Sequence, residues 1–105
     1  MALRKVVAII RNEALEKVEA RLIDLRVRGI SVTKVKGYGE YANFFKSDWM
    51  VTHARIEIFT EEKMADQIAD AIMEGAHTGT EGDGLVAVLP VLKLYRIRTK
   101  NETVG

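Results

Sequence analysis

The sequence predicts an α+β domain in which one antiparallel sheet carries two helices on one face. Four runs are β-branched or alternate in polarity, as strands do: residues 3–10, 30–38, 51–60 and 85–89. Two segments between these runs repeat apolar residues at helical spacing. The order is therefore βαββαβ, two similar halves joined by residues 39–50, and its simplest packing is a single ferredoxin-like domain over residues 1–105.

The first half is predicted to contain a strand, a helix and a second strand. Asn12 is expected to cap the helix, because its side chain can accept a hydrogen bond from an unpaired backbone N–H there. Gly29 is expected to end it in a left-handed conformation, just after Arg26 and Arg28. The predicted apolar stripe of this helix is Leu15, Val18, Leu22 and Leu25.

The second half repeats this pattern. Thr60 is expected to cap the second helix and Gly75 to end it. Pro90 is expected to interrupt the last strand, an extended segment follows to Arg98, and residues 99–105 are expected to be a flexible tail. In the strand over residues 51–60, alternation turns Ala54, Ile56 and Ile58 inward and His53, Arg55 and Glu57 outward, while the second helix carries a stripe of Met64, Ile68, Ala71 and Ile72.

The second strand carries apolar residues on both faces. Val32 and Val35 point in opposite directions, because side chains alternate along a strand. One face of the sheet packs on the helices, so the other meets water or another subunit. We therefore expect an oligomer.

Composition excludes several classes of function. A formal net charge of +1 gives no reason to expect nucleic-acid binding, and no segment is long and apolar enough for membrane insertion. The absence of cysteine excludes disulfides and thiolate chemistry. The short apolar run after Met1 ends at Arg11, too soon for a signal peptide, so a cytoplasmic protein is expected.

No catalytic or metal site is predicted. His53 and His77 have no further ligand at metal-binding spacing, and both are expected at the surface. No serine lies in a nucleophile elbow, and no pair of acids is suitably spaced for catalysis. We therefore expect no enzyme and no catalytic cofactor.

Two glycine-containing segments are candidate ligand sites. Gly37-Tyr38-Gly39 ends the second strand, where glycine lets a ligand approach the backbone closely, although this motif alone favours a simple strand-ending turn. Residues 78–84 hold three glycines, which can arrange backbone N–H groups around a phosphate, or can simply make a tight connection.

Two further clusters have a functional and a structural interpretation. Arg96 and Arg98 would lie on one strand face, about 7 Å apart, and can grip an anion or be merely solvated. An aromatic-rich loop can be a partner surface or can pack onto a core or a neighbouring subunit. Besides Tyr38, its aromatic residues are Tyr41, Phe44, Phe45 and Trp49.

Together these segments resemble the PII signal-transduction family over nearly the whole chain. The matching stretches are residues 8–11, 28–39, 55–58, 78–79 with 82–84, and 96–99. The resemblance implies a homotrimer that binds ATP, ADP or AMP in clefts between subunits. It also implies a regulated partner protein, which reads the nucleotide state through the 39–50 loop. A membrane transporter is among the candidate partners. In the family, 2-oxoglutarate is often a second signal.

The resemblance also implies roles for individual residues. Gly37 would line the adenine side together with Ser31 and Phe59, and Tyr38 and Gly39 would continue that contact. Arg96 and Arg98 would hold phosphates. The phosphate turn would consist of Gly82, Asp83 and Gly84.

Three departures from the family pattern affect the phosphate end and the loop. Leu85 stands where the family carries a lysine, and Glu40 stands where it carries a base. The loop is about seven residues shorter, His53 takes the place of its basal lysine, and the usual modified tyrosine has no secure counterpart. With less positive charge, ADP or AMP should bind at least as tightly as ATP, unless Mg²⁺ or Lys46 compensates.

Two other functions remain open from the sequence. Leu85 and Glu40 are compatible with an oligomeric interaction module that has lost nucleotide binding. A slow nucleotide hydrolase would need Glu40 or Asp83 to orient water. The two arginines and the glycine turn favour nucleotide binding over the first alternative.

Overall fold

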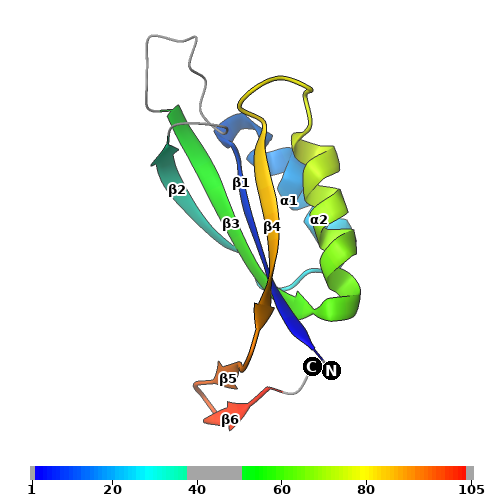
Figure 1. Cartoon of the computed structure of the whole chain (residues 1–105), viewed down its shortest axis with the longest axis vertical. Helices are drawn as coiled ribbons and strands as arrows, with labels where there is room; N and C mark the ends of the chain where they lie inside the picture. The colour runs from blue at the N-terminus through cyan, green and yellow to red at the C-terminus, as the bar shows by residue number, and fades with distance from the viewer. Residues whose placement is uncertain (1, 38–50, 104–105) are drawn as a thin grey trace.

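The computed structural model describes residues 2–37 and 51–103, and these form a four-stranded antiparallel sheet with helices on one side (Figure 1). The strand order is β2-β3-β1-β4, so the two halves of the chain interleave at the centre of the sheet. This confirms the predicted ferredoxin-like order and the helices on one face. The predicted loop aromatics, together with Tyr38, Gly39, Glu40 and Lys46, lie outside the described residues.

Nine elements make up the described chain. The two central strands place every second residue under the helices, and this gives a continuous apolar core. Its centre is Val6, Ala8 and Ile10 of β1 with Ile58, Ile56 and Ala54 opposite them on β3. The elements are β1 (Leu3–Arg11), η1 (Asn12–Ala14), α1 (Leu15–Asp24), β2 (Ser31–Gly37), β3 (Val51–Glu61), α2 (Glu62–Ala76), β4 (Gly84–Val91), β5 (Tyr95–Arg96) and β6 (Asn101–Glu102).

The start and end of α1 differ from the prediction. The side chain of Asn12 caps nothing; a 3-10 turn comes first, and the Asn12 side-chain oxygen instead accepts a hydrogen bond from Lys34 Nζ on β2. The left-handed residue after the helix is Arg26, with φ 63°, and not Gly29. The N–H groups of Arg26 and Val27 bond back to the carbonyls of Ile23 (2.8 Å) and Leu22 (3.1 Å), which is the hydrogen-bond pattern of a Schellman motif.

The ends of α2 also differ from the prediction. The N-cap residue of α2 is Glu61, not Thr60, and no side-chain hydrogen bond caps the helix. Instead, the N–H of Glu62 donates to the carbonyl of Ala2 (3.0 Å). Gly75 lies inside the helix, where a Cβ would stand 2.9 Å from Val18 Cγ2. Gly75 therefore lets α1 and α2 approach closely, and both predicted apolar stripes face the core.

The C-terminal segment is more ordered than expected. Pro90 lies within β4 and does not interrupt it, because β4 is an edge strand and needs ladder bonds on one side only. Beyond it, β5 pairs with β6 as a two-residue hairpin, so part of the predicted tail is folded. Arg98 lies in the turn between these strands, and the prediction that it shares a strand face with Arg96 is wrong.

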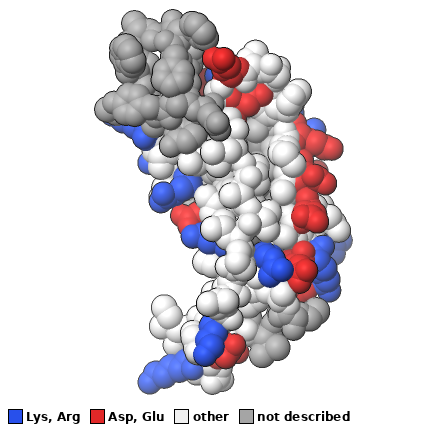
Figure 2. Space-filling view, viewed as in Figure 1, with Lys and Arg blue, Asp and Glu red and all other residues white. Residues whose placement is uncertain are grey.

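The sheet face opposite the helices is open in the described chain. It carries Leu85 and Leu89, which are 37% and 42% exposed, in an uncharged band over β1 and β4 (Figure 2). His53 lies on this face but is only 1% exposed, so its predicted surface position is wrong. His53 pairs with Arg11 of β1 on one side and with Val35 of β2 on the other. His77 is exposed, as expected.

Candidate functional site

The connection from α2 to β4, residues 77–83, is a turn whose shape depends on glycine. Three glycines in and beside it have positive φ: Gly79 at 84°, Gly82 at 89° and Gly84, at the start of β4, at 107°. At Gly84 a Cβ would lie only 1.8 Å from the carbonyl oxygen of Ile9. The dense glycines therefore serve a tight turn that presses against the end of β1.

Asp83 ties this turn together with its carboxylate. One oxygen, Oδ2, accepts the backbone N–H groups of Thr78 (2.8 Å) and Gly79 (2.9 Å), and the other accepts the Thr78 hydroxyl. Burial by itself would raise the pKa of Asp83, but these hydrogen bonds and one from Arg11 outweigh it and lower the pKa to about 2. Asp83 is therefore an anion that stabilises the turn.

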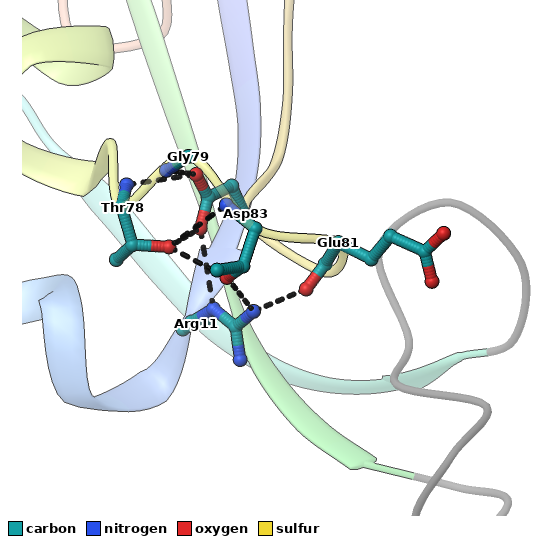
Figure 3. Close-up of polar contacts among 6 residues, drawn as sticks. Arg11, Thr78, Gly79, Glu81 and Asp83 are labelled. Carbon is teal, nitrogen blue, oxygen red and sulfur yellow. Dashed lines mark hydrogen bonds and ion pairs between the residues drawn. The ribbon is translucent and has the colours of Figure 1, made fainter.

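Arg11, the last residue of β1, reaches into the same turn (Figure 3). Its Nε lies 3.4 Å from Asp83 Oδ1, and its Nη2 donates to Thr80 Oγ1 (3.1 Å) and to the carbonyl oxygen of Glu81. Nη2 also lies 3.0 Å from where a Gly82 Cβ would be. The third nitrogen, Nη1, makes no hydrogen bond within residues 2–37 and 51–103.

The turn is thus a loop held in shape by hydrogen bonds to the Asp83 carboxylate, with the Arg11 guanidinium beside it. Asp83 already occupies two of the N–H groups that sequence analysis assigned to a phosphate cradle. The role of Asp83 toward a ligand, like that of Gly82 and Gly84, stays a prediction. Sequence analysis missed the contact of Arg11, because only the strand register places it beside a turn about seventy residues later.

A second hollow lies at the other end of the sheet. It has a volume of about 780 Å³ and brings together three residues predicted to contact a nucleotide: Ser31, Phe59 and Arg96. Phe59 is 53% exposed, and the Lys5 ammonium stands 5.7 Å from the centre of its ring. An exposed aromatic ring in a hollow is a surface on which a base can stack. Arg98 does not line this hollow.

Within one chain, the predicted ligand residues therefore form two groups at opposite ends of the sheet. Gly84 pairs with Ile10 and Phe59 pairs with Lys5, so five residues of β1, or about 17 Å, separate the two groups along the strand. Figure 1 shows the 77–83 turn at one end and β5–β6 at the other. Gly37 lies at the end of β2, opposite Val51. No single chain brings all these residues around one ligand.

Comparison with known proteins gives one consistent answer. Residues 3–101 match the family described as nitrogen regulatory protein P-II. The chain is 33% identical over 104 residues to the nitrogen regulatory protein P-II of Azospirillum brasilense, covering 92% of this chain and 93% of the relative. It is 35% identical over 107 residues to that of Pasteurella multocida (strain Pm70), covering 95% and 96%.

A plant relative and a solved structure of a plant PII protein give the same match. The nitrogen regulatory protein P-II homolog of Arabidopsis thaliana is 33% identical over 103 residues, covering 90% of this chain and 53% of the relative, so the chain spans about half of that relative's length. The crystal structure of Arabidopsis thaliana PII bound to citrate superimposes with a TM-score of 0.82 at 33% identity, covering 97% of this chain and 89% of that one.

Fold and matches together define a small ferredoxin-like signalling regulator. More specifically, the chain belongs to the nitrogen regulatory protein P-II family, as its sequence motifs predicted.

Proposed function

We propose that the chain is a cytoplasmic homotrimeric regulator that binds an adenine nucleotide between subunits and reports it to a partner protein through residues 39–50. It acts as one domain, without catalysis, and the regulated protein is a transporter or an enzyme. No helix in the described residues is long and apolar enough to cross a membrane. Neither nucleic acid nor membrane insertion is part of this function.

The observation that carries the proposal is the separation of the two residue groups. The glycine turn with Arg11 offers phosphate-type contacts, and the hollow with Phe59 and Arg96 offers a base-type surface. A neighbouring subunit can bring its hollow to the turn of the first, and the open sheet face supplies an apolar surface for that assembly. A trimer would then hold three equivalent composite sites.

The geometry favours ADP or AMP at least as strongly as ATP. Leu85 is half-exposed on the open face next to the turn and contributes no charge there. Arg11 is matched by Asp83, 3.4 Å away, so the pair adds no net positive charge for a second or third phosphate. Mg²⁺ remains the ion that would restore ATP binding.

The turn argues against Asp83 as the acid of the hydrolase alternative, and Glu40, the other candidate, lies outside the described residues. A general base must accept a proton near neutral pH, and Asp83, with a pKa of about 2, is too weakly basic for that. Its oxygens are also already occupied by Thr78, Gly79 and Arg11. Loss of nucleotide binding, and hydrolysis that uses Glu40, remain the alternatives that experiment decides.

The test combines sedimentation with calorimetry on the full chain. Sedimentation equilibrium should give about three chains per particle, and titration with AMP, ADP and ATP, each with and without Mg²⁺, should show one site per chain. Without Mg²⁺, ATP should bind no tighter than ADP. If the trimer binds none of the three nucleotides, the alternative of an interaction module without nucleotide binding is supported. If the protein is a stable monomer, the proposed site between subunits is wrong.

A further inference from the structure

The hollow around Phe59 carries more positive charge than the nucleotide residues assigned so far require. Besides Arg96 on β5, it is lined by Arg26 and Arg28 from the α1–β2 connection. Within residues 2–37 and 51–103, none of these three guanidinium groups makes an ion pair or a side-chain hydrogen bond. Positive charge therefore comes from two separate segments around one hollow.

The acids that share this hollow are already engaged. Glu57 lies 2.6 Å from Lys5 and 3.4 Å from Arg55, and the side-chain hydrogen bond from Lys5 lowers its pKa. Glu61 lies 3.3 Å from Lys63. Both acids have cations of their own, so the three arginines are left for an external anion.

Arg26 is also held in an unfavourable backbone conformation. Its φ of 63° is the left-handed region, which glycine adopts freely and an arginine does not. The position terminates α1 by the Schellman pattern, for which glycine is the usual residue. A side chain kept at such a position, lining a hollow and without a partner in the described chain, indicates a role in binding.

We propose that Arg26 and Arg28 form a second anion subsite, so that the hollow takes a nucleotide with a negative group on its ribose side as well as on its 5′ phosphate chain. With the base on Phe59 and the 5′ phosphates at Arg96 and the neighbouring turn, the α1–β2 connection meets the ribose side of the ligand. A 3′-phosphate, or the second phosphate of a cyclic dinucleotide, has the charge this subsite needs. This inference rests on the proposed nucleotide site.

The probe pair is adenosine 3′,5′-bisphosphate and ADP. Both carry two phosphates, but they differ in where the second phosphate lies, and two separate monoesters also carry more negative charge than one diphosphate. The arginine variants therefore decide where that charge is bound. Calorimetry on the wild-type trimer should show tighter binding of the bisphosphate than of ADP. Arg26→Gly and Arg28→Gln should each reduce that preference about tenfold, the loss of one charge-assisted contact, while ADP binding changes little.

Arg26→Gly has a useful second property. Because glycine relieves the left-handed strain, the unfolding temperature should rise or hold while the preference for the bisphosphate falls, which separates loss of binding from loss of folding. Arg21→Gln is the matched control: it removes the same charge from an arginine paired with Glu74 at 3.0 Å, outside the hollow, and should leave the preference unchanged.

The outcomes are distinct. If ADP binds but the bisphosphate binds no tighter, the second subsite is wrong and the proposed function stands. If the preference exists but survives both Arg26→Gly and Arg28→Gln, or falls equally in Arg21→Gln, these two residues do not form it. If wild type binds no nucleotide, the proposed function itself fails and the subsite fails with it.

Discussion

The two ends of this molecule use arginine in opposite ways. At the 77–83 turn, Arg11 is held by Asp83, Thr80 and the Glu81 carbonyl, and its charge is matched (Figure 3). At the Phe59 hollow, Arg26 and its neighbours line a cavity without a partner among the described residues. At the first end, hydrogen bonds within the chain hold the arginine in place. At the second end, the positive charge of the arginines can interact with an anionic ligand.

This difference separates stability from binding. Removing a group from the turn leaves buried or half-buried partners unsatisfied, which lowers the free energy of unfolding. Removing an arginine side chain from the hollow leaves nothing unsatisfied among the described residues of the free protein, so it should lower ligand affinity without lowering the free energy of unfolding. Each prediction below tests one side of this contrast.

The largest effect is expected at Gly84. Gly84→Ala places a Cβ 1.8 Å from the Ile9 carbonyl oxygen at a φ of 107°, so both overlap and strain oppose folding. We expect a loss of about 3 kcal/mol or more in the free energy of unfolding, measured by urea denaturation. Gly29→Ala is the control, because nothing lies within 4 Å of its Cβ. Equal unfolding midpoints for the two variants would contradict the described turn.

Arginine substitutions at the two ends should diverge next. Arg11→Ala should lower the free energy of unfolding by about 1–3 kcal/mol, because it strips hydrogen bonds from Asp83 and the turn. Arg96→Ala and Arg98→Ala should leave unfolding unchanged and weaken nucleotide binding roughly ten- to hundredfold. Paired urea and calorimetric titrations measure both. Wild-type affinity in both the Arg96 and the Arg98 variant would remove the phosphate assignment of these arginines.

The smallest effect is a pH dependence centred on Asp83. Its pKa is about 2 in the folded chain, against 3.8 for an unperturbed aspartate, so its ionised form stabilises folding. That stability is complete above about pH 4 and is lost as the pH falls toward 2, amounting to about 1–2 kcal/mol after allowance for solvent screening. Asp83→Asn should flatten this part of the urea-midpoint profile. An unchanged profile in that variant would assign the acid sensitivity to other carboxylates.

Periodicity was sufficient to predict the fold. Apolar alternation in β1 and β3 and the stripes of both helices identified the core, because burial imposes those periods directly. Local end signals were less reliable. Asn12 and Thr60 are good capping residues, yet Asn12 bonds to Lys34 across the sheet and α2 begins at Glu62. Tertiary contacts outweighed local propensity there.

The candidate site was only partly predictable for the same reason. The glycines of the 77–83 turn were visible, since their spacing signals unusual backbone. The contact of Arg11 depends on the register of β1 against β4, which no local pattern encodes. Gly29 stood three residues beyond the true left-handed position, and nothing in the sequence marks Arg26 as that residue. Arg98 was misplaced because the β5–β6 turn begins directly after Arg96.

The most direct test of the account is subunit complementation. One variant, Arg11→Ala, damages the turn and keeps the hollow; the other, Arg96→Ala, removes a cation from the hollow and keeps the turn. Each alone should bind ADP weakly. When the two are unfolded, mixed in equal amounts and refolded together, about a quarter of the sites in random trimers should pair an intact turn with an intact hollow and bind like wild type. If calorimetry shows no such restored high-affinity fraction in mixed trimers, the nucleotide does not bridge two subunits and the composite site is wrong.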